Sequence, residues 1–161
     1  MSDAIIQVAK YIRDLLSKTE EVVKIGRSNV NQDNFTNEFI VIDSIAPQTL
    51  ISSNNSFSNN NINIVNRFKI PLSIRFYGDN ALTNANLFLG LSTHQKGTEL
   101  SIDYGVEIYR MSSLLDLSNL LGSQYYNLYE ITLNCKYNYM ATISTDAINY
   151  NDIEFTFIKN Y

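Results

Sequence analysis

Few residues of this chain could perform nucleophilic, acid–base or metal chemistry. It has one histidine, His94, and one cysteine, Cys135. No cysteine or carboxylate lies at metal-ligand spacing beside His94, which argues against zinc. A catalytic triad would need His94, yet no serine or cysteine lies in a nucleophile elbow such as G-x-S-x-G. Phosphate-binding glycine loops and C-x-x-C pairs are also missing from the sequence.

Three acidic residues, Glu99, Asp103 and Glu107, recur every four positions, as paired carboxylates on one helix face would. Gly105 and the strand pattern that follows it interrupt such a helix, so separate solvated charges are the favoured interpretation. We therefore predict no catalytic residue, no metal site and no bound cofactor, and an enzyme is the least favoured class.

The amino-acid composition limits the functional classes that remain. The chain has 161 residues, 45% of them hydrophobic, which suits one globular domain over residues 1–161. The net charge of −4 argues against nucleic-acid binding, which requires clustered Lys and Arg. No run of about 18 apolar residues is present, so we expect no membrane contact.

The strongest structural signal is the alternation from Leu128 to Ser144. Apolar residues occupy the odd positions, including Ile131, Leu133 and Cys135, and polar residues the even positions from Glu130 to Asn138. This period of two predicts one long strand with a single covered face. Its tyrosines share the apolar face, so we interpret them as core residues rather than as a base-stacking surface.

The other elements must surround this strand. An amphipathic helix begins at Ser2 or Asp3, and a second follows the turn at Gly78 and Asp79. The second helix has an apolar stripe of Leu82, Ala85, Phe88 and Leu89. The pattern also predicts a helical segment at 93–102, broken near Gly97, and a connecting segment at 112–122 with one helical turn. Strands are predicted at 39–45, 62–77 and 106–111, with short strands at 22–25 and 153–157. Pro71 lacks an N–H donor and is expected at a sheet edge or a bulge.

This order predicts an α+β fold. We expect an antiparallel β-sheet of about four to six strands, two or three helices packed on one face, and a long β-hairpin. Residues 52–61 (SSNNSFSNNN) have almost no apolar content and are predicted to be the mobile hairpin tip. Its candidate assembly or docking residues are Ser52, Asn54, Asn55, Phe57, Asn59 and Asn60.

Four segments, in this order and spacing, give the chain a family resemblance. They are RFYGDNA (75–81), GVEIYRM (105–111), LLDLSNL (114–120) and YEITLNCKYNY (129–139). Together the chain resembles the tail-terminator, or head–tail joining, proteins of the tailed-phage neck over residues 39–45 and 68–145. The stretch 52–61 and the strand after Asp152 are longer than this family pattern.

The resemblance implies a structural virion protein that forms a ring at the neck, ends the tail and joins it to the head. Six copies would surround a lumen through which DNA passes without specific binding. The implied partners are other copies of the chain, a head connector or adaptor protein, and tail tube or sheath proteins. The protein would be made in the host cytoplasm and incorporated into the virion.

Two other classes stay open at this point. One is another phage ring protein, such as a head-completion or tail-tube subunit. The other is a non-catalytic, monomeric binding module that uses the tyrosine-lined face of the long strand as its pocket.

Overall fold

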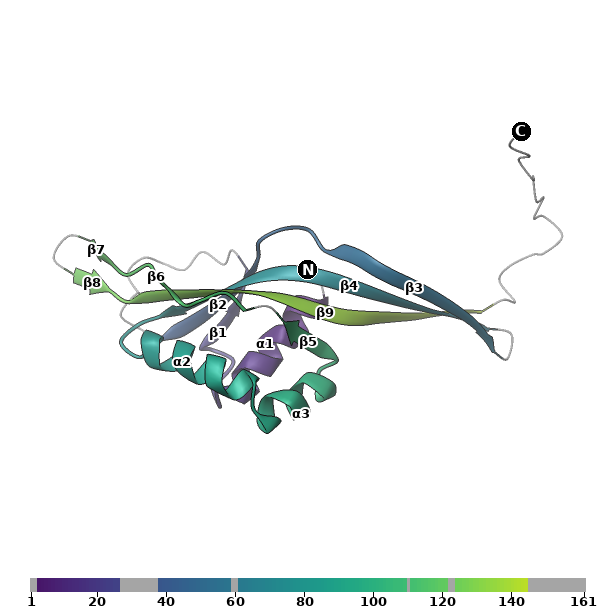
Figure 1. Cartoon of the computed structure of the whole chain (residues 1–161), viewed down its shortest axis with the longest axis horizontal. Coiled ribbons are helices and arrows are strands. Elements are labelled where there is room, and N and C mark those ends of the chain that lie inside the picture. Colours follow the sequence, from purple (N-terminus) through teal and green to yellow (C-terminus); the bar gives the residue numbers. More distant parts are fainter. Residues whose placement is uncertain (1–2, 27–37, 59–60, 110, 122–123, 145–161) are drawn as a thin grey trace, which may run out of the picture.

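The computed structural model describes residues 3–26, 38–58, 61–109, 111–121 and 124–144. Within these ranges the chain forms three helices and an open, seven-stranded mixed sheet. Figure 1 shows the helices gathered beneath one part of the sheet, while three strands continue far beyond them. The fold is α+β, as the sequence predicts.

The sheet is built around its two longest strands, β4 (Asn61–Tyr77) and β9 (Leu128–Ser144), which pair antiparallel along their whole lengths. The main strand order is β1-β2-β4-β9-β5; β3 pairs with β4 beyond the end of β2, and β6 pairs with β9 beyond the end of β5. The remaining elements are α1 (Asp3–Leu15), β1 (Val23–Ile25), β2 (Phe39–Ser44), β3 (Thr49–Ser58), α2 (Ala81–Ser92), α3 (Gln95–Asp103), β5 (Val106–Tyr109), β6 (Leu115–Asp116), and a separate hairpin of β7 (Asn119–Leu121) and β8 (Gln124–Tyr126).

Two details of the predicted sheet are wrong. The sheet is mixed and not purely antiparallel, because β1 runs parallel to β2. The segment 112–122 contains β6 and β7 where one helical turn was expected. Beyond β5, backbone groups at the edge of β9 are available for hydrogen bonding, and this segment bonds to them. The N–H of Ser112 donates to the carbonyl oxygen of Thr132 at 2.7 Å, and that of Leu117 to Leu128 at 2.8 Å.

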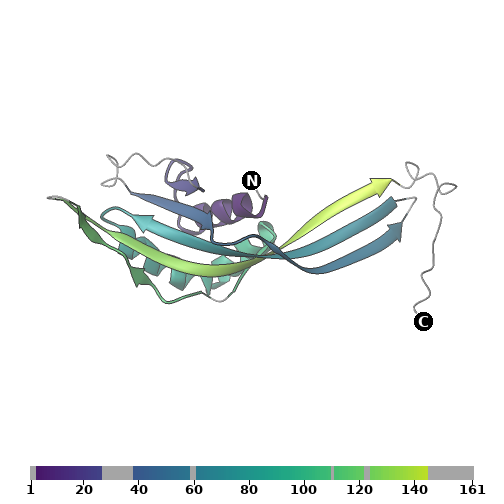
Figure 2. The same ribbon diagram turned by 90° about the horizontal axis from the view of Figure 1, so that it is seen from above.

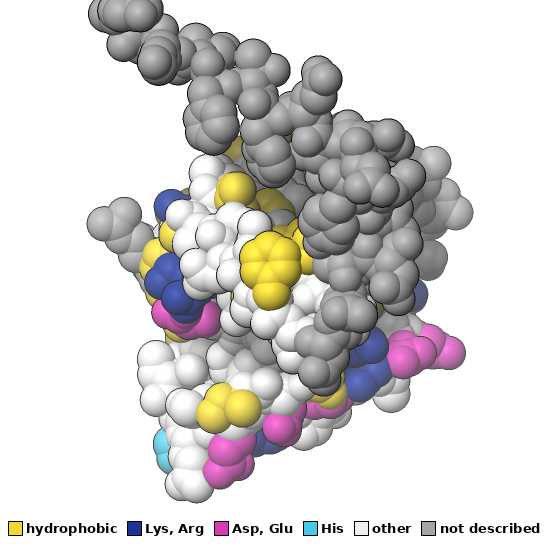
Figure 3. Space-filling view, turned by 90° about the vertical axis from the view of Figure 1, so that its right-hand side faces the viewer, with side chains coloured by type: hydrophobic (Ala, Val, Ile, Leu, Met, Phe, Trp, Pro, Cys, Tyr) yellow, Lys and Arg dark blue, Asp and Glu magenta, His cyan; other side chains and the backbone are white. Residues whose placement is uncertain are grey.

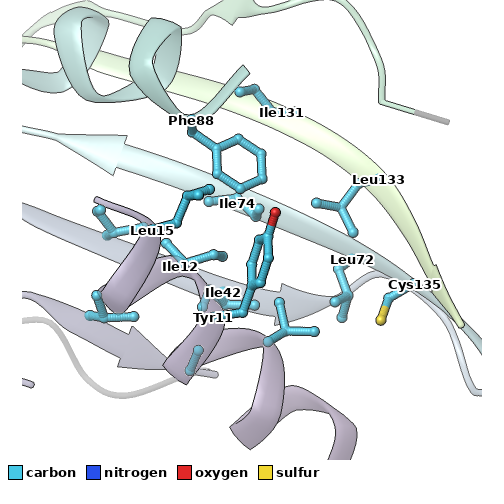
Figure 4. Packing of buried hydrophobic residues seen from close by; sticks show 14 of the residues in the cluster. Tyr11, Ile12, Leu15, Ile42, Leu72, Ile74, Phe88, Ile131, Leu133 and Cys135 are labelled. Carbon is cyan, nitrogen blue, oxygen red and sulfur yellow. The ribbon is translucent and has the colours of Figure 1, made fainter. Parts of the chain in front are cut away.

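The hydrophobic core lies between the helices and one face of the sheet. On that face Ile74 lies opposite Ile131 and Leu72 opposite Leu133, and all four are fully or almost fully buried. Figure 4 shows the side chains of α1 and Phe88 of α2 meeting these strand residues. The predicted core face of β9 is therefore confirmed from Ile131 to Cys135.

Helix α1 also places a large aromatic residue in this core. Tyr11 is among the largest fully buried side chains and lies one turn after Val8, which is also buried. Burial raises the pKa of the Tyr11 phenol to about 12. The stripe on α1 is therefore wider than its aliphatic residues alone indicate.

The predicted stripe on α2 is partly wrong. Ala81, Ala85 and Phe88 are buried, whereas Leu82 is largely exposed. These buried positions follow the i, i+4, i+7 spacing of one helix face, which begins one residue earlier than predicted. The N-cap is Asn80 and makes no side-chain capping bond, so Gly78 and Asp79 end the preceding strand without capping the helix.

Helix α3 is continuous through Gly97, where a break was predicted. A Cβ atom at this position would lie 2.4 Å from the carbonyl oxygen of Leu91 and 2.7 Å from that of Ser92. The glycine therefore allows α3 to approach the end of α2 closely, and the two helices pack together without a longer connection.

Pro71 lies inside β4, opposite Asn134 of β9. On its other side, β2 pairs with β4 only as far as Leu72, and β3 pairs with β4 only from Lys69 toward the free end of the arm. The carbonyl oxygen of Pro71 accepts the N–H of Ile45 at 3.0 Å, so its nitrogen faces this gap between two neighbours. The predicted edge position is thus a local one in the middle of the sheet, where the missing donor breaks no ladder bond.

Candidate assembly surface on the three-stranded arm

The most distinctive surface of the molecule is an arm of three strands that extends past the helices. It consists of β3, the first half of β4 (residues 61–68) and the last part of β9 (residues 137–144), which Figures 1 and 2 show running side by side. Paired strands of 17 residues, such as β4 and β9, span about 55 Å, far more than the helices cover. The arm therefore has no second layer of secondary structure among the described residues.

All ten residues of β3 are exposed, although they are regularly paired with β4. This corrects the predicted hairpin tip at 52–61, because Ser52, Asn54, Asn55 and Phe57 lie on a strand. The other two candidate docking residues, Asn59 and Asn60, fall outside the described residues. Ser52 and Asn54 lie on one face of the arm, and Asn55 and Phe57 on the other, as the strand alternation requires.

The register of the arm places apolar residues in rows across the strands. Phe57 of β3, Ile62 of β4 and Ile143 of β9 form one row on the face that continues the core face. Phe57 is 74% exposed and Ile143 is 43% exposed. On the opposite face, Val65 lies beside Met140, which is 76% exposed. Exposed apolar groups arranged in rows are typical of surfaces that contact other proteins.

The outer arm carries no charged side chain in the described residues from Thr49 to Ser58, 61–66 and 138–144. Figure 3, which looks along the arm from its free end, shows uncharged and hydrophobic side chains at this end and charged ones around and below them. Asn and Ser side chains keep the surface polar without adding charge. A neighbouring protein can therefore approach the arm without desolvating an ion.

At its root the arm is held to the body by a charged cluster on the helix-free face. The guanidinium of Arg67 lies 2.6 Å from the carboxylate of Glu107, which also accepts from Lys136 at 3.1 Å. The ammonium of Lys136 lies 4.2 Å from the ring centroid of Tyr109. The two cations hold the pKa of the Glu107 carboxyl below its usual range, with Lys136 as the larger cause.

On the other face of the root, Phe68 of β4 stacks on Tyr137 of β9 with ring centroids 5.5 Å apart. The hydroxyl of Tyr137 donates to the side-chain oxygen of Gln48, just before β3. These contacts join all three strands where they leave the core. The interpretation of the β9 tyrosines as core residues holds in part: Tyr129 and Tyr137 pack against the core, whereas Tyr139 on the arm is largely exposed.

A second polar cluster, centred on Glu38, links the helices to the sheet. Glu38, just before β2, accepts hydrogen bonds from Lys18 after α1, from Asn80 at 3.3 Å and from the buried Asn84 of α2 at 2.8 Å. These donors hold the pKa of the Glu38 carboxyl below its usual range, Lys18 contributing most. The Glu38 carboxylate is thus occupied by three donors from the helical side of the molecule, which favours a structural role.

The residues singled out for chemistry lie on different elements and form no catalytic or metal-binding group among the described residues. His94 is the exposed residue before α3. Cys135 is buried in the core, and desolvation raises the pKa of its thiol to about 12. Helix α3 ends at Asp103, so Glu107 lies on β5, separated from Glu99 as predicted. No group of three potential metal ligands occurs among the described residues.

Sequence reasoning located the β3 side of the arm and missed the β4 and β9 sides. Ile62, Met140 and Ile143 are functional candidates because of their position and exposure. The signal for Ile62 and Ile143 was the alternation itself, which continues beyond the residues that the helices cover.

None of the helices in the described part of the chain is long and apolar enough to cross a membrane.

A helix-covered core joined to an uncovered arm with apolar rows is the architecture of a subunit that contacts other protein chains. Residues 4–160 match the family model described as phage neck terminator protein, so the chain belongs to that family. The resemblance found in the sequence is thereby confirmed. The family identifies a structural, tail-terminating component of the phage virion that associates with other head and tail proteins. Among curated proteins, none matches this chain.

Proposed function

We propose that copies of this protein close into a ring at the phage neck, where the ring ends the tail and joins it to the head connector. The number of six copies follows from the resemblance to tail-terminator proteins. The observation that carries the ring is the arm, with its exposed apolar rows and with no charged side chain among the described residues of its outer part. The single core cluster of the described residues supports the prediction of one domain over residues 1–161. A cyclic ring covers the same surfaces of every subunit with identical neighbours.

The ring would surround a lumen through which the genome passes without specific binding. Two features of the chain support this role. Its net charge is −4, and the described outer arm has neither Lys nor Arg. Affinity for duplex DNA comes largely from cationic contacts with phosphate, so such a surface lets DNA slide past.

The proposed partners are a head connector or adaptor protein on one side of the ring and tail tube or sheath proteins on the other. The six residues Ser52, Asn54, Asn55, Phe57, Asn59 and Asn60 are proposed as part of the docking surface. Synthesis in the host cytoplasm would precede incorporation into the virion. Closure of the ring can require the tail end as a template, in which case the free protein is monomeric at low concentration.

A reconstruction of the phage particle tests this proposal. We expect one ring of this chain at the neck, with an open lumen and no contact to DNA bases. A position at the head vertex or along the tail would assign the chain to a head-completion or tail-tube role. Its absence from purified virions, together with a cytoplasmic monomer that binds another ligand, would defeat the proposal.

A further inference from the structure

Within the described part of the chain, the arm has two open edges, and both lack the usual protection. No described residue pairs with the outer side of β3, and none pairs with the β5 side of β9 after Tyr137. Exposed edges normally carry charge, proline or a bulge that prevents pairing with another chain. The outer arm has no charge and no proline in its described residues, and the irregularity of β3 lies near the root, between Leu50 and Ser52.

The directions of the two edge strands restrict how copies can meet. Both β3 and β9 are antiparallel to β4, so they run parallel to each other from the root of the arm to its free end. Copies related by a rotation around a ring axis point their arms the same way. The β3 edge of one copy and the β9 edge of the next then meet as parallel strands. A two-fold dimer would instead bring two identical edges together antiparallel.

The side-chain rows favour a second copy as the occupant of each edge. The row of Phe57, Ile62 and Ile143 crosses all three strands and is open at both ends. A copy placed alongside continues this row, so that Phe57 of one subunit lies near Ile143 of the next. Because the outer arm is uncharged, identical arms do not repel each other. One repeated contact satisfies both edges, whereas a single foreign strand would satisfy only one.

We propose that β3 of each subunit pairs in parallel with the outer part of β9 in the neighbouring subunit, joining the arms into one closed sheet around the ring. This inference rests on the proposed ring and specifies its contact. With six copies the sheet would contain about eighteen strands, and barrels of roughly sixteen to eighteen strands leave an aqueous channel.

Engineered cysteines test the contact directly. Asn55 of β3 and Ala141 of β9 share a row in which Ile64 of β4 lies between them. Within one subunit they are therefore two strand spacings apart, about 9.6 Å, which is too far for a disulfide. Between paired subunits the spacing would be about 4.8 Å, which a disulfide can bridge. Native Cys135 is buried and does not compete.

Particles carrying Asn55→Cys together with Ala141→Cys are oxidised and analysed on a non-reducing gel. We expect a ladder of covalent multimers that ends at the closed ring, and reduction should collapse it to the monomer. Each single variant should remain monomeric. Replacing Ala141→Cys by Tyr139→Cys or Ile143→Cys shifts the tested register by one row in either direction, so one of the three pairs should cross-link strongly.

Each outcome has a distinct meaning. Dimers formed by a single variant would reveal a two-fold contact between identical edges and overturn the parallel pairing. A neck ring that is seen in the particle but not cross-linked by any of the three pairs would overturn the closed sheet and leave the proposed function standing. Absence of the protein from virions would remove the ring and this contact together.

Discussion

Replacing Phe57 by serine should impair assembly while leaving the fold of the subunit almost unchanged. The side chain is 74% exposed, so about 150 Å² of a typical Phe surface remains to be buried by a neighbour. At about 25 cal/mol per Å² this area corresponds to at most about 4 kcal/mol per contact. The costs of ordering and desolvation lower the expected loss to about 1–3 kcal/mol, or roughly 5–150-fold in each contact. A ring contains one such contact per subunit, so the losses accumulate on closure.

The fold should tolerate this change because serine already occurs at four other positions of β3, from Ser52 to Ser58, and because Phe57 buries little within the subunit. We expect the free energy of unfolding to change by less than about 0.5 kcal/mol. Light scattering of the free protein and the infectious titre of complemented phage measure assembly. The matched control is Ile102→Ser, which removes an equally exposed residue, at 76%, from α3 outside the arm. Normal assembly of Phe57→Ser, or an equal defect in both variants, would refute the reasoning.

Three further predictions concern the body of the protein. Leu133→Ala should lower the free energy of unfolding by about 2–5 kcal/mol because the side chain is 2% exposed. Lys136→Ala, on the other face of the sheet, should lower it by less than about 1 kcal/mol. Equal shifts of the two denaturant midpoints would contradict the register of β9. Cys135 should resist thiol reagents in the folded protein and react once it unfolds, since its pKa is raised to about 12; rapid labelling of the native state would show that the thiol is accessible. The pKa of Glu38 is lowered chiefly by Lys18, so this interaction stabilises the fold above the ordinary value of 4.5 and is lost as the pH falls through the lowered pKa. Glu38→Gln should therefore flatten the acid side of the Tm–pH curve, and an unchanged curve would exclude this contribution.

The sequence predicts elements well where burial and alternation coincide. Strand β9 has the bounds predicted for it, because Ile131, Leu133 and Cys135 repeat with period two and all enter the core. The same pattern continues to Ile143, which is exposed because no described helix reaches that part of the strand. Periodicity records which side chains share a face, and it does not say where the covering layer ends.

The elements that sequence reasoning missed depend on pairing rather than on burial. Strand β3 is rich in Asn and Ser, which favour turns, yet the edge of β4 holds it extended. β6 forms in the same way against the edge of β9. The parallel pairing of β1 with β2 also depends on the path of the chain between them, which local propensity does not encode. The candidate docking residues Ile62 and Ile143 were missed because the alternation placed them on the apolar face that was expected to be covered.

In the proposed ring, assembly of the subunits and order of the arm are linked through β3. This strand buries no side chain, so within the subunit it is stabilised mainly by backbone hydrogen bonds to β4. Fixing each residue costs about 1–2 kcal/mol of conformational entropy, and a backbone hydrogen bond contributes a net of about 0.5–1.5 kcal/mol, so the two terms nearly cancel. If a neighbouring subunit pairs with the free edge of β3, it adds hydrogen bonds to residues that are already extended. The same contact also buries Phe57. We therefore expect a neighbouring subunit to stabilise β3, whose pairing is only marginally favourable in the isolated subunit. Binding to this strand should cost less conformational entropy than binding to a loop that must first be ordered.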